Sequence, residues 1–170
     1  ETGANDTPIL TAPSSISLTD TSAADTFSNQ TGTLSATDAE GTSLSFGMTG
    51  GTTGGSDVFS AVTYDIKKVG TYGTLYLVST GADKGKYVYV PNATAINAVS
   101  SNQSESFTLT ASDGSASASQ TLTINVTGAN DTPILTAPSS ITLTDTSAAD
   151  TFSNQTGTLS ATDAEGTSLS

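Results

Sequence analysis

Apolar and polar residues alternate with a period of two along most of the chain. Leu75 and Leu77 alternate with Thr and Tyr, and Leu122, Ile124 and Val126 alternate with Thr and Asn. Successive side chains of an extended backbone point to opposite sides, so this pattern predicts strands with one buried and one solvated face. The same alternation recurs in segments 16–19, 34–36, 44–48, 62–66, 87–89 and 107–111.

Turn-forming residues separate these segments. They are Ala39-Glu40-Gly41, Gly50-Gly51, Gly54-Gly55, Gly81-Ala82-Asp83 and Ser112-Asp113-Gly114. The two glycine pairs flank a Thr-rich stretch that we interpret as a loop. Residues 94–100 form the one plausible helical turn. Seven or eight short strands spaced by turns predict an all-β, antiparallel β-sandwich.

The chain also repeats itself. Residues 2–45 return as residues 127–170 at an offset of 125 (127 − 2), with Thr142 standing where the first copy has Ser17. A fixed period of this kind is typical of a tandem array. We expect four parts: residues 1–7 as the linker end of a preceding repeat, 8–127 as a complete repeat, 128–132 as the inter-repeat linker, and 133–170 as the first strands of the next, incomplete repeat.

Composition narrows the classes of function. The sequence has no Cys, His, Arg or Trp, which excludes disulfides, Cys/His zinc sites and a Ser-His-Asp triad. Four lysines stand against 16 acidic residues, and the net charge of −12 has the wrong sign for nucleic acid or anionic lipid. No apolar run approaches the roughly 20 residues that span a membrane. We therefore expect no nucleic-acid partner, no membrane insertion and no enzymatic activity.

Six segments resemble, in the same order, the VCBS and cadherin-like repeats of giant secreted bacterial adhesins, often of the RTX type. They are LSATDAEGTSLSF (34–46), YGTLYL (72–77), GKYVYVPN (85–92), AINAV (95–99), FTLTASDG (107–114) and LTINVTGANDTP (122–133). The resemblance covers most of residues 8–133. It implies an immunoglobulin-like or cadherin-like sandwich at the bacterial cell surface, extracellular and secreted, that acts in cell adhesion and biofilm attachment without catalysing a reaction.

The resemblance also implies calcium at the junctions between repeats. Asp38 and Glu40, with their copies Asp163 and Glu165, resemble the Asp-x-Asp ligand group of cadherin junctions, with Glu in place of the second Asp. The pairs Asn5-Asp6 and Asn130-Asp131 match the middle of the cadherin linker motif. Gly128 and Thr132 replace two of that motif's ligands, and the Leu-Asp-Arg-Glu element is missing, which implies fewer or weaker ions.

A physical argument points to the same residues. Calcium takes six to eight oxygens at about 2.3–2.6 Å, and alternate residues of a strand place two carboxylates on one edge. A junction crowded with carboxylates would repel itself, and a divalent ion would offset this repulsion and stiffen the array. Asp113 is a further candidate ligand. Ordinary turn chemistry is the favoured interpretation for it, and also for Asp20, Asp25, Asp145 and Asp150.

The function predicted from sequence is a structural extender repeat, stiffened by Ca²⁺ and partnered by neighbouring repeats of the same chain. The alternative is a carbohydrate- or cell-binding module that acts through exposed Tyr side chains. Its candidate pairs are Tyr72/Tyr76 and Tyr87/Tyr89, for which packing in the core or on a sheet face is the favoured interpretation. A glycoside hydrolase is disfavoured because Asp38 and Glu40 lie on a turn with no apolar pocket in sequence reach.

The partial repeat at residues 127–170 lacks the strands that would complete its sheets. Residues 127–170 carry only the first strands of a repeat, and an isolated hairpin is marginally stable. Because segment 2–45 is nearly identical, the core of residues 46–126 can accept either copy. We expect one copy to pack normally, and the other to be ordered by a neighbouring chain through strand exchange of 2–45 or 127–170.

Overall fold

The computed structural model describes residues 3–166 and 169, and its fold is all-β with almost no helix. The elements are β1 (Ile9–Leu10), β2 (Ile16–Thr19), β3 (Gln30–Thr33), β4 (Ala36–Thr37), β5 (Ser45–Met48), β6 (Thr52–Phe59), β7 (Val62–Val69), β8 (Gly73–Leu77), β9 (Lys86–Pro91), α1 (Ala93–Asn97), β10 (Gln103–Ser112), β11 (Ser117–Thr127), β12 (Ile134–Leu135) and β13 (Ala161–Thr162). The short helix α1 falls where the sequence predicts a helical turn.

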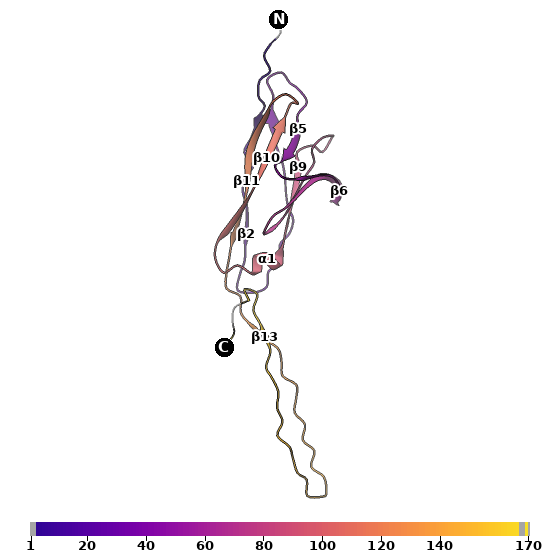
Figure 1. Cartoon of the computed structure of the whole chain (residues 1–170), viewed down its shortest axis with the longest axis vertical. Helices are drawn as coiled ribbons and strands as arrows, with labels where there is room; N and C mark the ends of the chain where they lie inside the picture. Colours follow the sequence, from indigo (N-terminus) through magenta and orange to yellow (C-terminus); the bar gives the residue numbers. More distant parts are fainter. Residues whose placement is uncertain (1–2, 167–168, 170) are drawn as a thin grey trace.

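Two sheets form the body of the molecule. One has the strand order β3-β9-β8-β7-β6, and the other has the order β2-β11-β10-β5. The expectation of purely antiparallel sheets is wrong at one place, because β2 pairs with β11 in parallel, with Ile16 opposite Ile124. The physical reason is visible in Figure 1: the chain enters the body at one end and leaves it for the arm at the opposite end. An early and a late strand of such a module therefore run in the same direction.

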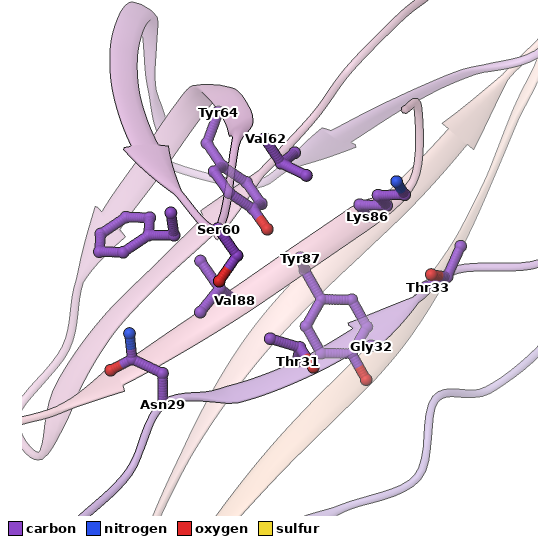
Figure 2. A pocket seen from close by; sticks show the side chains of 11 residues that line it. Asn29, Thr31, Gly32, Thr33, Ser60, Val62, Tyr64, Lys86, Tyr87 and Val88 are labelled. Atoms are coloured by element: carbon purple, nitrogen blue, oxygen red, sulfur yellow. The ribbon is translucent and has the colours of Figure 1, made fainter. Parts of the chain in front are cut away.

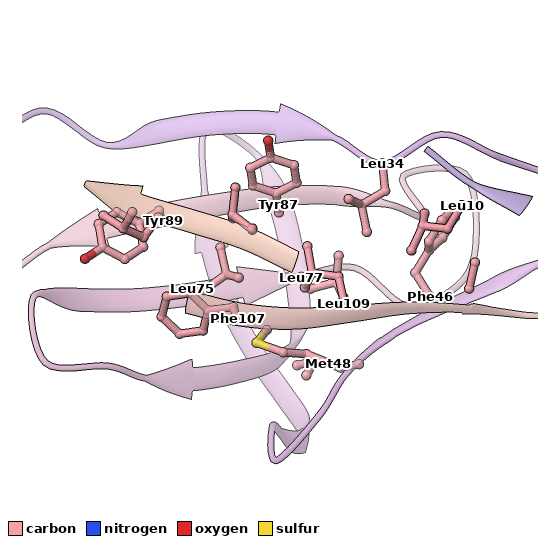
Figure 3. Close-up of a cluster of buried hydrophobic side chains, with 14 of the residues drawn as sticks. Leu10, Leu34, Phe46, Met48, Leu75, Leu77, Tyr87, Tyr89, Phe107 and Leu109 are labelled. Atoms are coloured by element: carbon pink, nitrogen blue, oxygen red, sulfur yellow. The ribbon is translucent and has the colours of Figure 1, made fainter. Parts of the chain in front are cut away.

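The predicted alternation matches the pattern of burial on β8, β10 and β11. On β11, Leu122, Ile124 and Val126 are fully buried, whereas Thr121, Asn125 and Thr127 are exposed. Buried residues from both sheets form one core, in which Phe107 and Leu109 of β10 meet Leu75 and Leu77 of β8 (Figure 3). Burying a side chain of this size contributes about 1.5–3 kcal/mol each. On β9 the alternation fails, because the consecutive residues Tyr87, Val88 and Tyr89 are all buried.

The Thr-rich stretch interpreted as a loop is strand β6, which pairs antiparallel with β7. The glycines Gly54 and Gly55 within this stretch led to its interpretation as a loop. Gly54 has a φ of +80°, and the register of pairing shifts between Thr53 and Asp57, which marks a bulge. A glycine in a strand often signals such a bulge rather than the end of the strand.

The two copies of the repeated segment have different surroundings. Residues 9–37 of the first copy supply β1 to β4 and pack against the core, so that Leu18 and Leu34 are buried. Their counterparts Leu143 and Leu159 are exposed, on an arm of residues 133–166 that extends away from the body (Figure 1). Within the described part of this arm only β12 and β13 pair, in the same register as β1 and β4. One copy packs normally, as expected, and ordering of the other by a neighbouring chain stays a prediction.

A half-buried polar contact ties the sheets together. The Tyr89 hydroxyl donates to Oε1 of Glu105 at 2.6 Å, and Oε2 of Glu105 accepts from the backbone N–H groups of Thr71 and Tyr72 at 2.6 and 3.3 Å. Burial and the Glu105 carboxylate raise the pKa of the Tyr89 hydroxyl, which therefore remains a donor. The turn between β7 and β8 is thereby held against β10.

Tyr89→Phe is expected to destabilise the protein by about 1–3 kcal/mol, because it removes a hydrogen bond to a charged acceptor and leaves an oxygen of Glu105 without its donor. Tyr72→Phe is the matched control, since no hydrogen bond of the Tyr72 hydroxyl is found among the described residues. Urea denaturation followed by circular dichroism measures both. Equal stability of the two variants would contradict this role.

Candidate metal centre

Three carboxylates meet where the body joins the arm. Asp20 follows β2, Asp131 lies in the linker after β11, and Glu165 follows β13. One carboxylate oxygen from each lies within 4.8 Å of the other two. The site therefore combines one residue of the complete repeat with two residues of the next copy.

Backbone pairing brings these segments together. The parallel ladder of β2 and β11 continues into a hydrogen bond from the Asp20 N–H to the Thr127 carbonyl at 2.9 Å. The Ala129 N–H then donates to Oδ2 of Asp20 at 3.3 Å. On the arm, the Asp131 N–H donates to Oε1 of Glu165 at 3.0 Å. The linker thus holds Asp131 between the end of one repeat and the start of the next.

The carboxylates are buried and incompletely partnered. Asp20 is 3% exposed and Asp131 is 4% exposed. Oδ1 of Asp20, both carboxylate oxygens of Asp131 and Oε2 of Glu165 are buried without a hydrogen-bond partner. Buried carboxylates without partners are costly, and the large majority of buried polar atoms in proteins have a partner. A bound cation would satisfy these oxygens together.

Electrostatics lead to the same requirement. Burial, followed by the charges of Glu165, Asp25 and Asp163, raises the pKa of Asp131. Burial is also the largest cause that raises the pKa of Asp20, to which Asp131 and Asp25 add. Within the described part of the chain the ion pairs are Lys67–Asp57 and Lys86–Asp83, neither of which is at this site. The negative charge therefore has no lysine to offset it.

The donor set fits a hard cation. The three residues offer oxygen atoms alone, the ligands that calcium and magnesium prefer over transition metals. Oxygens bound to one calcium at about 2.3–2.6 Å lie at most about 5 Å apart, which matches the observed grouping. Asp20, Asp131 and Glu165 are thus the residues that would hold the ion.

The structure brings together two of the ligands predicted for this end of the chain, Asp131 and Glu165. Asp163 lies near enough for its charge to raise the pKa of Asp131. Asn130 is exposed, and its side-chain amide donates to the carbonyl of Asp131 at 2.8 Å. Its role as a calcium ligand stays a prediction.

Asp20 is the residue that sequence reasoning assigned to turn chemistry. A signal was present, because Asp20 continues the buried face of β2 at the next alternate position after Ile16 and Leu18. An acid at an inward-facing position needs a partner, whereas an acid in a solvated turn does not. Asp25 lies beside the site and binds the backbone N–H of Thr21 at 2.5 Å through its carboxylate.

The N-terminal candidates Asn5, Asp6, Asp38 and Glu40 lie at the opposite end of the body, where Asp113 joins them. The Asp6 N–H donates to Oε2 of Glu40 at 3.3 Å, and the Asn5 amide donates to Oδ2 of Asp113 at 2.9 Å. The Asp38 carboxylate accepts from the Thr42 N–H through Oδ1, and its Oδ2 is buried without a partner. Asp6 is exposed, and among the described residues no third carboxylate joins Asp6 and Glu40 in a metal-sized cluster.

Asp113 has the turn role that the sequence favoured. Its Oδ1 accepts from the N–H groups of Ser115 and Ala116 at 2.6 and 2.7 Å. The Ala116 bond, then the Asn5 amide and the Ser115 bond, lower the pKa of Asp113. The carboxylate therefore stays charged and closes the turn between β10 and β11.

The chain matches no protein-family model and no curated protein. In the part of the chain that is described, no helix has the length and apolar character needed to cross a membrane.

Proposed function

We propose that the chain is a structural extender repeat whose junctions bind calcium and thereby become stiff. The observation that carries this proposal is the composite cluster of Asp20, Asp131 and Glu165, with its buried, unpartnered oxygens. A cation bound there links a residue of one repeat to two residues of the next. Binding therefore opposes bending at the linker.

The repetition supports an array. The second copy keeps Asn130, Asp131, Asp163 and Glu165 in the positions of Asn5, Asp6, Asp38 and Glu40. A preceding repeat with its own counterpart of Asp20 would complete the N-terminal group in the same way. Each repeat thus carries complementary parts of a junction at its two ends, and identical junctions can form along the whole array.

The type of all-β fold is part of the same proposal. Two sheets that share one core suit an immunoglobulin-like or cadherin-like sandwich, as the resemblance to VCBS and cadherin-like repeats implies. A Cys-free acidic array fits an extracellular adhesin on a bacterial surface, where it would hold an adhesive domain away from the cell. Extracellular modules bind calcium at about 10⁻⁴–10⁻³ M, so the junctions would stiffen outside the cell.

The Tyr alternative has less support. The side chains of Tyr87 and Tyr89 lie in the core, in agreement with the packing interpretation of that pair. They offer no exposed platform of stacked rings. We also propose no catalytic role for Asp38 and Glu40, because the Glu40 carboxylate accepts the Asp6 N–H and the Asp38 carboxylate accepts the Thr42 N–H.

Small-angle X-ray scattering of a protein with two complete repeats tests the proposal. In Ca²⁺ we expect a longer maximum dimension and a narrower range of conformations than in EDTA, because the cation removes repulsion at the linker. Re-addition of Ca²⁺ should restore the extended form, and K⁺ at matched ionic strength is the control for screening. Identical scattering in Ca²⁺ and EDTA would exclude calcium-dependent stiffening.

A further inference from the structure

A groove lies on the outer face of the five-stranded sheet, away from the metal centre. The outward-facing side chains of β3 and β9 form its floor, with Thr31 opposite Val88 and Thr33 opposite Lys86. The tip of the β6–β7 hairpin forms its wall (Figure 2). The groove is open to solvent on one side, and its volume is about 270 Å³, close to the lower end of small-ligand sites.

The wall is held rigidly. Phe59, Tyr64 and Tyr76 form an aromatic cluster with ring centroids 4.8–6.4 Å apart. Together with Val78 and Val88 they make a second small core on this outer face. The hairpin is therefore anchored across the sheet, and the groove beside it is preformed.

The turn at the tip is strained. Ser60 and Ala61 have φ values of 48° and 64°, in the left-handed region where Asn and Gly are usual for a two-residue hairpin turn. Non-glycine residues in this region are held there by their surroundings, and such strain is concentrated at ligand sites. Here it places Ser60 at the rim of the groove.

The lining is rich in hydroxyl groups that lack protein partners. Thr31, Thr33, Ser60 and Tyr64 each bring a hydroxyl, and Asn29 adds an amide. Among the described residues none of these side chains makes a hydrogen bond to protein, although Tyr64 is mostly buried. A hydroxyl both donates and accepts, so this set matches a ligand that carries several hydroxyl groups itself.

The groove carries little net charge in a strongly acidic chain. Among the described residues no acidic side chain lines it, although the chain has 16 acids and a net charge of −12. Its one cation, Lys86, is paired with Asp83 at 2.5 Å. Phe59, Val62 and Val88 supply an apolar surface for the ring carbons of a ligand. Neither an anion nor a cation would find a free counter-charge here.

We propose that this groove binds one unit of a neutral saccharide. The hydroxyl groups of Thr31, Ser60 and Tyr64 bind the sugar hydroxyls, and the apolar wall covers one face of the ring. The site requires neither the metal centre nor exposed stacked tyrosines, so it is independent of the extender function.

Nuclear magnetic resonance titration of the ¹⁵N-labelled full chain tests the site. The probes are the neutral disaccharides maltose, cellobiose and lactose, with glucuronate and glucosamine as charged counterparts. We expect saturable shifts with at least one neutral disaccharide, at millimolar affinity, confined to the amides of residues 29–33, 59–64 and 86–88. The charged sugars should bind more weakly.

Two variants make the test specific. Tyr64→Phe and Thr31→Val should each weaken binding about 3- to 10-fold, because each removes one neutral hydrogen bond to the ligand without creating a cavity. Tyr72→Phe and Thr108→Val, which lie outside the groove, should leave the affinity unchanged. Absence of saturable shifts with all three disaccharides, unchanged affinity in both groove variants, or equal affinity for a charged sugar would overturn the proposal.

Discussion

Leu34→Ala is expected to destabilise the protein by about 2–5 kcal/mol, whereas Leu159→Ala is expected to change the stability by less than about 0.5 kcal/mol. The two leucines occupy the same position of the two copies, with the same neighbours in sequence. Leu34 is 5% exposed in the core and Leu159 is 65% exposed on the arm. The first substitution leaves a cavity, and the second removes methyl groups that already contact water.

Urea denaturation at two protein concentrations measures both changes. Leu18→Ala and Leu143→Ala form a second matched pair, because Leu18 is buried and Leu143 is exposed. A loss of stability for Leu159→Ala that equals the loss for Leu34→Ala would contradict the exposed arm. If that loss grew with protein concentration, it would indicate that the arm packs on another chain, which is the strand exchange expected from the sequence.

The alternation of residues predicts the core because burial on a sheet has a period of two. Leu75, Leu77, Leu122, Ile124 and Val126 all point inward as their spacing indicates. The helical turn at 94–100 is predicted for a local reason as well. Asn92 caps α1, with its Oδ1 accepting the Ala95 N–H at 3.2 Å.

Non-local features escape the sequence pattern. Leu34 and Leu159 share their local sequence but differ in burial, so what separates them is the rest of the fold. The parallel pairing of β2 with β11 likewise depends on where the chain enters and leaves the module. Strand β6 was missed because its glycines permit a bulge and a turn equally well.

The candidate site was predictable in part. The Asp-x-Glu and Asn-Asp pairs identify the site residues of the second copy, because both pairs occur at the same positions in the two copies. Asp20 could be found only by treating an acid on a buried face as one that needs a partner. The parallel pairing of β2 and β11, which brings Asp20 to Asp131, is long-range and leaves no mark in the local sequence.

Calcium is expected to raise the melting temperature of the chain, and Asp131→Asn is expected to remove most of this response. At about 10 mM Ca²⁺, a dissociation constant of about 10⁻⁴ M gives roughly 2.7 kcal/mol of stabilisation, equivalent to several degrees. Asp131 offers two buried, unpartnered oxygens to the ion. Asn keeps the shape but loses the charge and one acceptor oxygen.

Asp6→Asn is the matched control, because Asp6 is the same residue in the first copy and lies exposed without a counterpart of Asp20 beside it among the described residues. It should keep the calcium response of the unaltered chain. Asp20→Asn and Asp145→Asn form a second pair, of which the first alone should lose the response.

Melting of the Asp131→Asn variant in EDTA shows whether Asp131 binds the ion or only supports the structure. Because burial and neighbouring acids raise the pKa values of Asp20 and Asp131, the protonated site is favoured in the folded state, and stability is lost as pH rises through these raised values. Asp131→Asn removes one of the mutually repelling charges, so in EDTA at neutral pH it should melt no lower than the unaltered chain. A variant that melts lower in EDTA, yet still gains the full stabilisation from Ca²⁺, would show that Asp131 supports the linker without binding the ion.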